Sequence, residues 1–191
     1  NSDIGTGFNG TSGGEAFVRV YSNVGVAVSS TTRVNDLRTD DSEAPAEIVA
    51  LTGGGFAIVW EEGDDNAGPL SNTDDFYARA FSAAGAPLNA SLPIAGASAD
   101  ALFEDYFGGG LAALSDGGFV AGVGVRDGSS NFDSSVIQVF NANGTSRLAP
   151  FQPYLDINPD GSGKQDAPNL TAITGGGFAA AVQSAGRPQI E

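Results

Sequence analysis

The chain has 191 residues, of which 23 are acidic and 8 are basic, and its formal charge is −15. It holds no histidine and no cysteine, which excludes Ser-His-Asp and Cys-His nucleophilic sites, disulfide bonds, and zinc or iron sites built on these ligands. This acidity argues against nucleic acid and anionic membranes as partners, and it favours hard divalent cations, above all calcium.

The first predicted strand opens a phrase that covers residues 17–25. Its aromatic and arginine side chains share one face and its valines share the other, which is the period-two alternation of a strand. The Ser-Asn-Val-Gly that follows is typical of a tight turn with glycine at positive φ. The same phrase returns at residues 77–85 and 136–144, so that its copies begin 60 and 59 residues apart.

A second phrase predicts a hairpin from residues 46–51 and 56–60, closed by a glycine-rich turn. The run at 56–60 is apolar on both faces and is therefore expected to be a central strand. The turn phrase that begins at Leu51 begins again at Leu114 and Ile173, 63 and 59 residues further along.

Acidic loops follow these hairpins. Residues 61–75 form the densest acidic stretch, and the shorter loop 127–133 is oxygen-rich at the equivalent place. Like charges so close together are either solvated or share a cation, and both alternatives stay open.

Two independent phrases with one period near 60 residues indicate three units, each of about four short strands, the fourth at residues 87–94 and its equivalents. We therefore expect an all-β, propeller-like array in a single domain. The expected units are residues 17–75, 76–135 and 136–191. Three units are too few to close a ring, so two chains would form a six-bladed ring, or the array would belong to a filament. Strand 178–182 would then pair with strand 17–21 and complete a shared blade.

The sharpest local signal lies at residues 156–166. Oxygen-bearing side chains at alternate positions followed by glycine are typical of a calcium loop. The predicted ligands are Asp156, Asn158, Asp160, Ser162 and Asp166. An EF-hand loop has a glutamate at its twelfth position, but this sequence has Ala167 there. The pattern therefore predicts a loop between strands rather than an EF-hand. An ordinary turn uses the same residues, and that alternative stays open.

Three further groups of residues bear on possible sites. Glu104 and Asp105, beside Tyr106 and Phe107, are candidates for a carboxylate pair in glycoside hydrolysis. Tyr106, Phe107 and Trp60 would stack on sugars if they are exposed, although Trp60 shares its strand face with apolar side chains and is expected in the core.

The third group recurs with the first phrase. Arg19, Arg79 and Gln138 hold one repeat position, which predicts a structural rung on a solvent-facing strand. The longest apolar runs are far shorter than the ~20 residues of a membrane-spanning helix, so no membrane insertion is expected.

The order of these motifs carries a resemblance. The residues concerned are Pro45, the run 51–60, the acidic stretch 61–75, the phrase 79–85 and Gln-Asp-Ala-Pro at 165–168. Together they resemble the tandem repeats of large secreted bacterial proteins of the hemolysin-type, RTX-associated calcium-binding and adhesin-like class. The likeness covers residues 17–183 and implies export and a surface setting, but the calcium-binding nonapeptide of that class is absent.

From the sequence we expect an exported, non-catalytic structural or adhesive module of the cell surface or extracellular matrix, stabilised by calcium. A carbohydrate-binding propeller is the alternative, and a glycoside hydrolase the third. The expected partners are calcium, glycans or other surface proteins, and further copies of the chain. The chain opens with Asn-Ser-Asp and no basic, apolar leader, which favours a mature or excised segment of a larger exported polypeptide.

Overall fold

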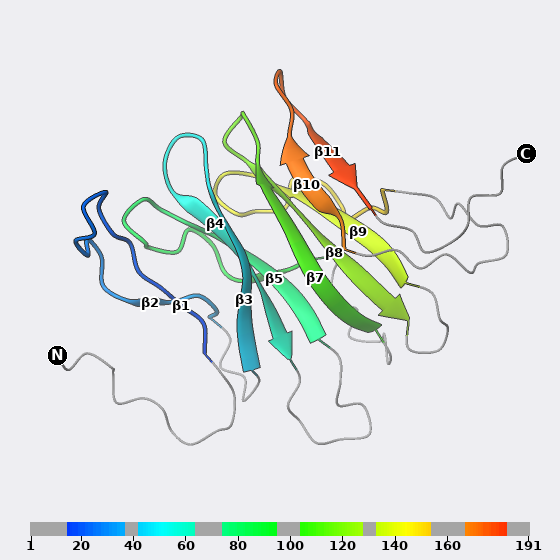
Figure 1. The fold of residues 1–191 in the computed structure, drawn as a ribbon, viewed down its shortest axis with the longest axis horizontal. Helices are drawn as coiled ribbons and strands as arrows, with labels where there is room; N and C mark the ends of the chain where they lie inside the picture. The colour runs from blue at the N-terminus through cyan, green and yellow to red at the C-terminus, as the bar shows by residue number, and fades with distance from the viewer. Residues whose placement is uncertain are drawn as a thin grey trace, which may run out of the picture.

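The computed structural model describes residues 15–36, 42–63, 74–94, 104–127, 133–153 and 167–182. These residues form β-strands and no helix, which confirms the all-β class. The strands follow one another along the longest axis of the molecule, with β1 and β2 at one end and β10 and β11 at the other (Figure 1).

The largest sheet is a four-stranded antiparallel meander. Its strands are β3 (Ser42–Ala50), β4 (Phe56–Gly63), β5 (Asp74–Phe81) and β6 (Leu92–Pro93), paired in that order. β4 is a central strand, as its two apolar faces predict. β3 and β4 form the expected hairpin, with a β-bulge between Pro45 and Glu47.

The next sheet repeats this plan. Its strands are β7 (Glu104–Ala113), β8 (Phe119–Asp127) and β9 (Asp133–Phe140). Phe151 takes the place that β6 holds in the first sheet, because it exchanges two backbone hydrogen bonds with Ile137, of 2.8 and 2.9 Å. The β7–β8 hairpin carries a bulge between Phe107 and Gly109, close to the position of the bulge in the β3–β4 hairpin.

Two half-sheets flank these two. β1 (Phe17–Val18) pairs with β2 (Thr32–Arg33), and β10 (Asn169–Ala172) pairs with β11 (Phe178–Ala181). Among the described residues, β1 and β11 therefore lie in separate two-stranded sheets, and no sheet closes on itself. Among the described residues, only β3–β6 shows the four strands expected of a unit. The two larger sheets each combine a hairpin from one expected sequence unit with strands that lie mostly in the next.

The two repeated phrases fold alike at every occurrence. In the first phrase, glycine donates to the carbonyl three residues before it at 3.0, 2.9 and 2.9 Å, and its φ is 80°, 80° and 81°. These glycines are Gly25, Gly85 and Gly144. In the second phrase, the residue that opens the turn donates to the glycine carbonyl four residues later, at 3.0, 2.8 and 3.2 Å. The openers are Leu51, Leu114 and Ile173.

The sheets stack face to face and bury three apolar clusters. The largest lies between the β3–β6 sheet and the β7–β9 sheet, around Phe76, Phe119 and Phe140. A second joins the β1–β2 sheet to β4 and β5 around Trp60 and Phe81, and a third joins the β7–β9 sheet to β10 and β11. Each full sheet is thus covered on both faces, whereas each half-sheet is covered on one.

Candidate functional site

The predicted calcium ligands, Asp156 to Asp166, lie outside the described residues, as does most of the acidic stretch after β4. In the part of the chain that the structure describes, no three aspartate or glutamate side chains come together as a metal-binding group. The calcium loop therefore stays a prediction from the sequence.

The aromatic and carboxylate candidates fall into two groups. Trp60 is 0% exposed and stacks on Tyr77 with ring centroids 5.7 Å apart, so it belongs to the core, as its strand face predicts, and cannot stack on a sugar. The backbone of Glu104, Asp105, Tyr106 and Phe107 lies in β7, but their side chains are outside the described residues.

Arg79 ties two neighbouring sheets together. Its Nε donates to the carbonyl of Asn89 at 2.7 Å within its own sheet. Its Nη1 donates to the carbonyl of Val34, just after β2, at 2.8 Å. Because these acceptors hold the guanidinium at the sheet boundary, Arg79 is only 8% exposed.

The repeat position of Arg79 corrects one expectation. Gln138 holds the same position in β9 and is also buried, whereas Arg19 beside β1 is exposed. The structural role is confirmed for Arg79, but the solvent-facing strand is wrong for β5 and β9, because a neighbouring sheet covers this face. At this repeat position only Arg19, at the end of the stack, is exposed to solvent.

Asp36 completes the tie between the first half-sheet and the β3–β6 sheet. The backbone N–H of Ser91 donates to both of its carboxylate oxygens at 3.1 Å, and Nη2 of Arg79 lies 3.6 Å away. Burial raises the pKa of Asp36, but the hydrogen bonds from Ser91 and the charge of Arg79 outweigh it, so that the net pKa is below its ordinary value.

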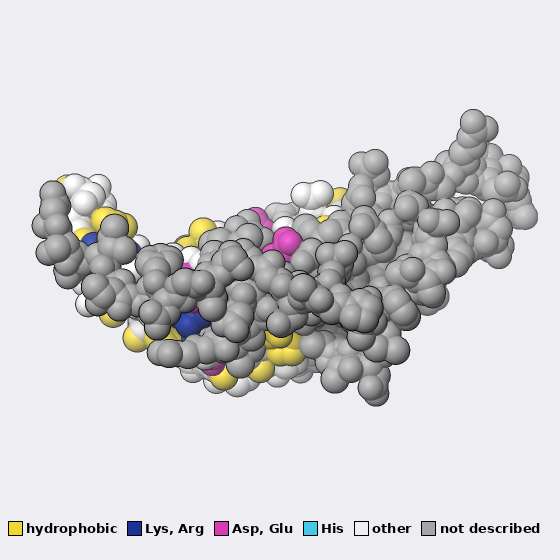
Figure 2. All heavy atoms as spheres, turned by 90° about the horizontal axis from the view of Figure 1, so that it is seen from below, with side chains coloured by type: hydrophobic (Ala, Val, Ile, Leu, Met, Phe, Trp, Pro, Cys, Tyr) yellow, Lys and Arg dark blue, Asp and Glu magenta, His cyan; other side chains and the backbone are white. Residues whose placement is uncertain are grey.

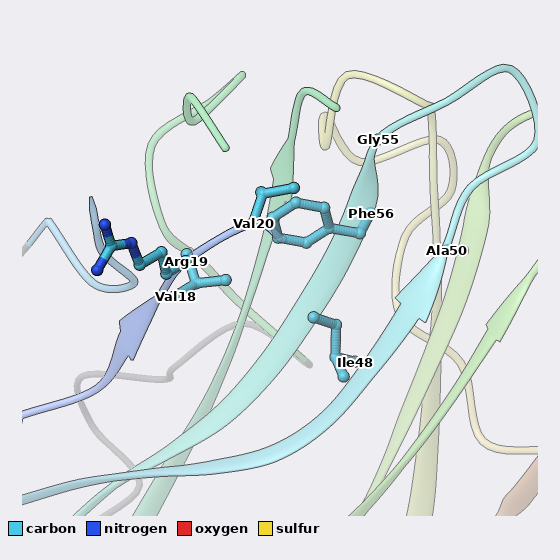
Figure 3. A pocket seen from close by; sticks show the side chains of 7 residues that line it. All are labelled: Val18, Arg19, Val20, Ile48, Ala50, Gly55 and Phe56. Carbon is cyan, nitrogen blue, oxygen red and sulfur yellow. The ribbon is translucent and has the colours of Figure 1, made fainter. Parts of the chain in front are cut away.

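Among the described residues, an open groove of about 320 Å³ lies at the β1 end of the stack. Val18 and Val20 line one side, and Ile48, Ala50 and Phe56 line the other. Figure 3 shows Phe56 and Ile48 pointing from β4 and β3 toward the segment that contains β1. This lining suits apolar side chains and a strand edge rather than a reacting group.

Large apolar side chains also reach solvent at this end of the molecule. Phe17, Tyr21 and Ile48 are all exposed, and Figure 2 shows hydrophobic atoms at the surface of the end that carries β1 and β2 (left). The sequence missed this groove. Its only signal was that the first phrase occurs at residue 17 with no hairpin phrase before it.

Comparison with protein-family models, with curated proteins and with solved structures finds no match for this chain. Among the described residues there is no helix long and apolar enough to cross a membrane.

Proposed function

We propose that this chain is a non-catalytic structural or adhesive module of an exported surface or matrix protein, built as a propeller-like array of β-units and stabilised by calcium. The single observation that supports this is the use of the repeated residues. The recurring turn residues, the recurring aromatic pairs and Arg79 serve turns, strand pairs and a contact between sheets, so these repeated positions build the architecture of the chain.

The equivalent aromatic pairs illustrate this use. Phe56 stacks on Phe81 at 5.2 Å, and Phe119 stacks on Phe140 at 4.7 Å, in equivalent registers of two sheets. Catalysis needs a few unequal groups that converge at one place, whereas a scaffold needs the same contact many times.

Calcium would act on the acidic loops. Their carboxylates repel one another without a cation, and a bound divalent ion would turn that repulsion into links between neighbouring turns. Calcium that binds only the folded chain at a hundredfold excess over Kd adds about 2.7 kcal/mol. For a chain of this size, the expected rise in Tm is then about 5–10 °C.

The test compares Tm in EDTA with Tm in millimolar calcium, with sodium chloride at matched ionic strength as the control for screening. The double variant Asp156→Asn/Asp160→Asn is expected to lose the calcium-dependent rise, and the matched variant Asp64→Asn/Asp65→Asn reports on the other acidic loop. An equal Tm in all three solutions would overturn calcium stabilisation.

Carbohydrate binding is the second candidate, because exposed aromatic side chains remain after Trp60 is excluded. Phe17 and Tyr21 lie on the outer face of the first half-sheet, with the Arg19 guanidinium 6.0 Å from the Tyr21 ring centroid. An exposed aromatic ring with a polar tip, such as that of Tyr21, offers an apolar face and a hydrogen-bonding group to a sugar ring. A glycan array with the wild-type chain and the Tyr21→Ala variant distinguishes the two candidates. Binding that Tyr21→Ala abolishes favours carbohydrate binding, and the absence of any binding favours the structural module.

A further inference from the structure

We propose that the groove beside β1 is the docking site for the β10–β11 hairpin of a second copy of this chain, so that the two half-sheets form one four-stranded sheet across the copies. The inference stands on strand register and burial alone and does not depend on calcium, export or adhesion.

The groove lies where the described residues provide no hairpin beside β1. In the β3–β6 sheet, the hairpin β3–β4 precedes β5, and in the next sheet β7–β8 precedes β9. The segment with β1 is equivalent to β5 and β9 by its sequence phrase, its turn and its pairing to the strand that follows. Among the described residues, however, no hairpin of the same chain pairs with it.

The burial of equivalent residues also indicates that a hairpin belongs in the groove. Leu111 of β7 is 5% exposed and lies in the cluster between two sheets, because the preceding hairpin covers it. Ile48 holds the same position in β3, yet it is 59% exposed and lines the groove. A hairpin laid in the groove would bury Ile48 as Leu111 is buried.

The edge of β1 is oriented for pairing. The backbone N–H of Val34 donates to the carbonyl of Ala16, and that of Val28 donates to the carbonyl of Val20, so the even-numbered residues face β2 and its turn. In an antiparallel strand the alternate residues face the other way. The backbone N–H and C=O groups of Arg19 and Tyr21 therefore point to the edge of β1 away from β2, as those of their equivalents Arg79 and Phe81 point to β4.

The β10–β11 hairpin matches this site because it carries the third copy of the glycine-rich turn phrase. In the complete sheets the phenylalanine after that turn pairs with the aromatic residue that ends the next strand: Phe56 with Phe81, and Phe119 with Phe140. The same register places Phe178 of one copy opposite Tyr21 of the next. It also places Ala181 opposite Val18.

The outer face of β11 fits the floor of the groove. Ala179 and Ala181 are exposed in the single chain. Their equivalents in β4, Ala57 and Val59, are buried in the cluster that covers the next sheet. In the assembled pair, the two exposed alanines would cover Ile48 and Phe56 of the partner in the same way.

A polar contact is expected to recur as well. Arg79 donates to the carbonyl of Val34 in the preceding sheet at 2.8 Å. Arg19 holds the Arg79 position and Pro153 holds the Val34 position, by the same spacing that relates the phrases. Arg19 of one copy would then donate to the carbonyl of Pro153 in the other.

Such an interface joins two different surfaces, so it is heterologous and each chain carries both halves. It either closes into a ring of defined size or continues as a series. Because each chain carries a charge of −15, association is expected to strengthen as salt screens the repulsion between copies.

The test is light scattering with size-exclusion chromatography over a concentration series, in low and high salt. Tyr21→Glu blocks the β1 end and Ala179→Glu blocks the β11 end, and both residues are exposed, so the single chain should fold. Leu88→Glu, at an exposed site in the connection between β5 and β6, is the matched control for the added charge. Circular dichroism checks that every variant retains its β-structure.

We expect the wild type and Leu88→Glu to associate and each blocked variant to stay monomeric. A mixture of Tyr21→Glu with Ala179→Glu should form a dimer only, since one free end of each kind remains. A monomeric wild type at every concentration and salt would overturn the proposal, as would association that neither blocking variant reduces.

Register is tested by cysteine pairing in this cysteine-free chain. Non-hydrogen-bonded residues opposite each other have Cα atoms about 4.5 Å apart, which suits a disulfide. Ala181→Cys mixed with Val18→Cys should cross-link under oxidation faster than Ala181→Cys mixed with Val20→Cys. Equal rates would refute the register.

Discussion

At the scale of single residues, the glycine-rich turns are not made of interchangeable glycines. Gly53 and Gly55 both have positive φ, of 100° and 94°. A Cβ at Gly53 would meet nothing within 4 Å, whereas a Cβ at Gly55 would lie 2.5 Å from the carbonyl oxygen of Phe81. Glycine is therefore favoured at position 53 only by the positive φ of the backbone. At position 55 it is favoured both by positive φ and by the close approach of β5.

This difference predicts unequal effects of alanine. Gly53→Ala should lower the free energy of unfolding by about 1–2 kcal/mol, the cost of a side chain at positive φ. Gly55→Ala should lower it by about 1–3 kcal/mol more, because the clash is with backbone that cannot rotate away. Urea unfolding followed by circular dichroism measures both, with Gly53→Ala as the control. Equal losses would contradict the close contact.

Asp36 predicts a pH dependence. Its folded pKa is below its ordinary value of 3.8, so its contribution to stability is present above that value and is lost as pH falls through the folded pKa. Asp36→Asn should lower the free energy of unfolding by about 1 kcal/mol at neutral pH, a figure reduced for solvent screening. The deficit should vanish in acid.

Urea unfolding at neutral pH and well below pH 4 tests this, and Ser91→Ala provides a second route to the same loss. It removes the Ser91 hydroxyl, which accepts a hydrogen bond from the backbone N–H of Asp36 at 3.3 Å and helps to lower the pKa of the Asp36 carboxyl, but it keeps the carboxylate. A deficit of the same size at both pH values would mean that Asp36 acts through packing and not through its charge.

At the scale of the elements, the sequence predicted the hairpins and their turns because these are local. The alternation in β5 and the apolar run in β4 determine strand type, and the glycines determine where the chain reverses. The burial of Arg79 could not be predicted in this way. It depends on a neighbouring sheet that supplies the carbonyl of Val34, from 45 residues away in the sequence.

The candidate site illustrates the same limit. The groove lies where, among the described residues, no hairpin pairs with β1, which is a property of how sheets stack and not of any single motif. The calcium loop was predicted from residue spacing alone, and its ligands lie outside the described residues. Local patterns identified the repeated parts, whereas the exposed surface depends on which parts have no neighbour.

The stacking of Trp60 on Tyr77 in β4 and β5 gives a prediction for one strand pair. The equivalent pair in β8 and β9 is Val123 with Val136, so the two sheets fill equivalent positions with side chains of different volume. Trp60→Val should lower the free energy of unfolding by about 2–4 kcal/mol, because the cavity beside Tyr77 is not refilled.

A double-mutant cycle provides the control. Trp60→Val combined with Tyr77→Val introduces the valine pair found in the other sheet. The double variant should lose less free energy of unfolding than the sum of the two single variants. Circular dichroism is the probe, because Trp60 is the only tryptophan in the chain. Strict additivity would show that the two rings do not act as a pair.

At the scale of the whole molecule, the chain is a stack whose layers differ in how much they are covered. The β3–β6 and β7–β9 sheets pack on both faces, while β1–β2 and β10–β11 pack on one. In a stack each layer depends mainly on its neighbours, so local stability is expected to fall from the middle toward both ends.

Hydrogen exchange tests this gradient. Amides of β4 and β8, such as those of Val59 and Val120, should be the slowest to exchange. Both strands are central in sheets that are covered on both faces, and these two side chains are fully buried. Amides of β10 and β11 should exchange first, through opening of the half-sheet alone. If copies associate end to end, the amide of Tyr21 should become slower at high protein concentration while that of Val59 does not change. Uniform protection would mean that the stack unfolds as one cooperative unit.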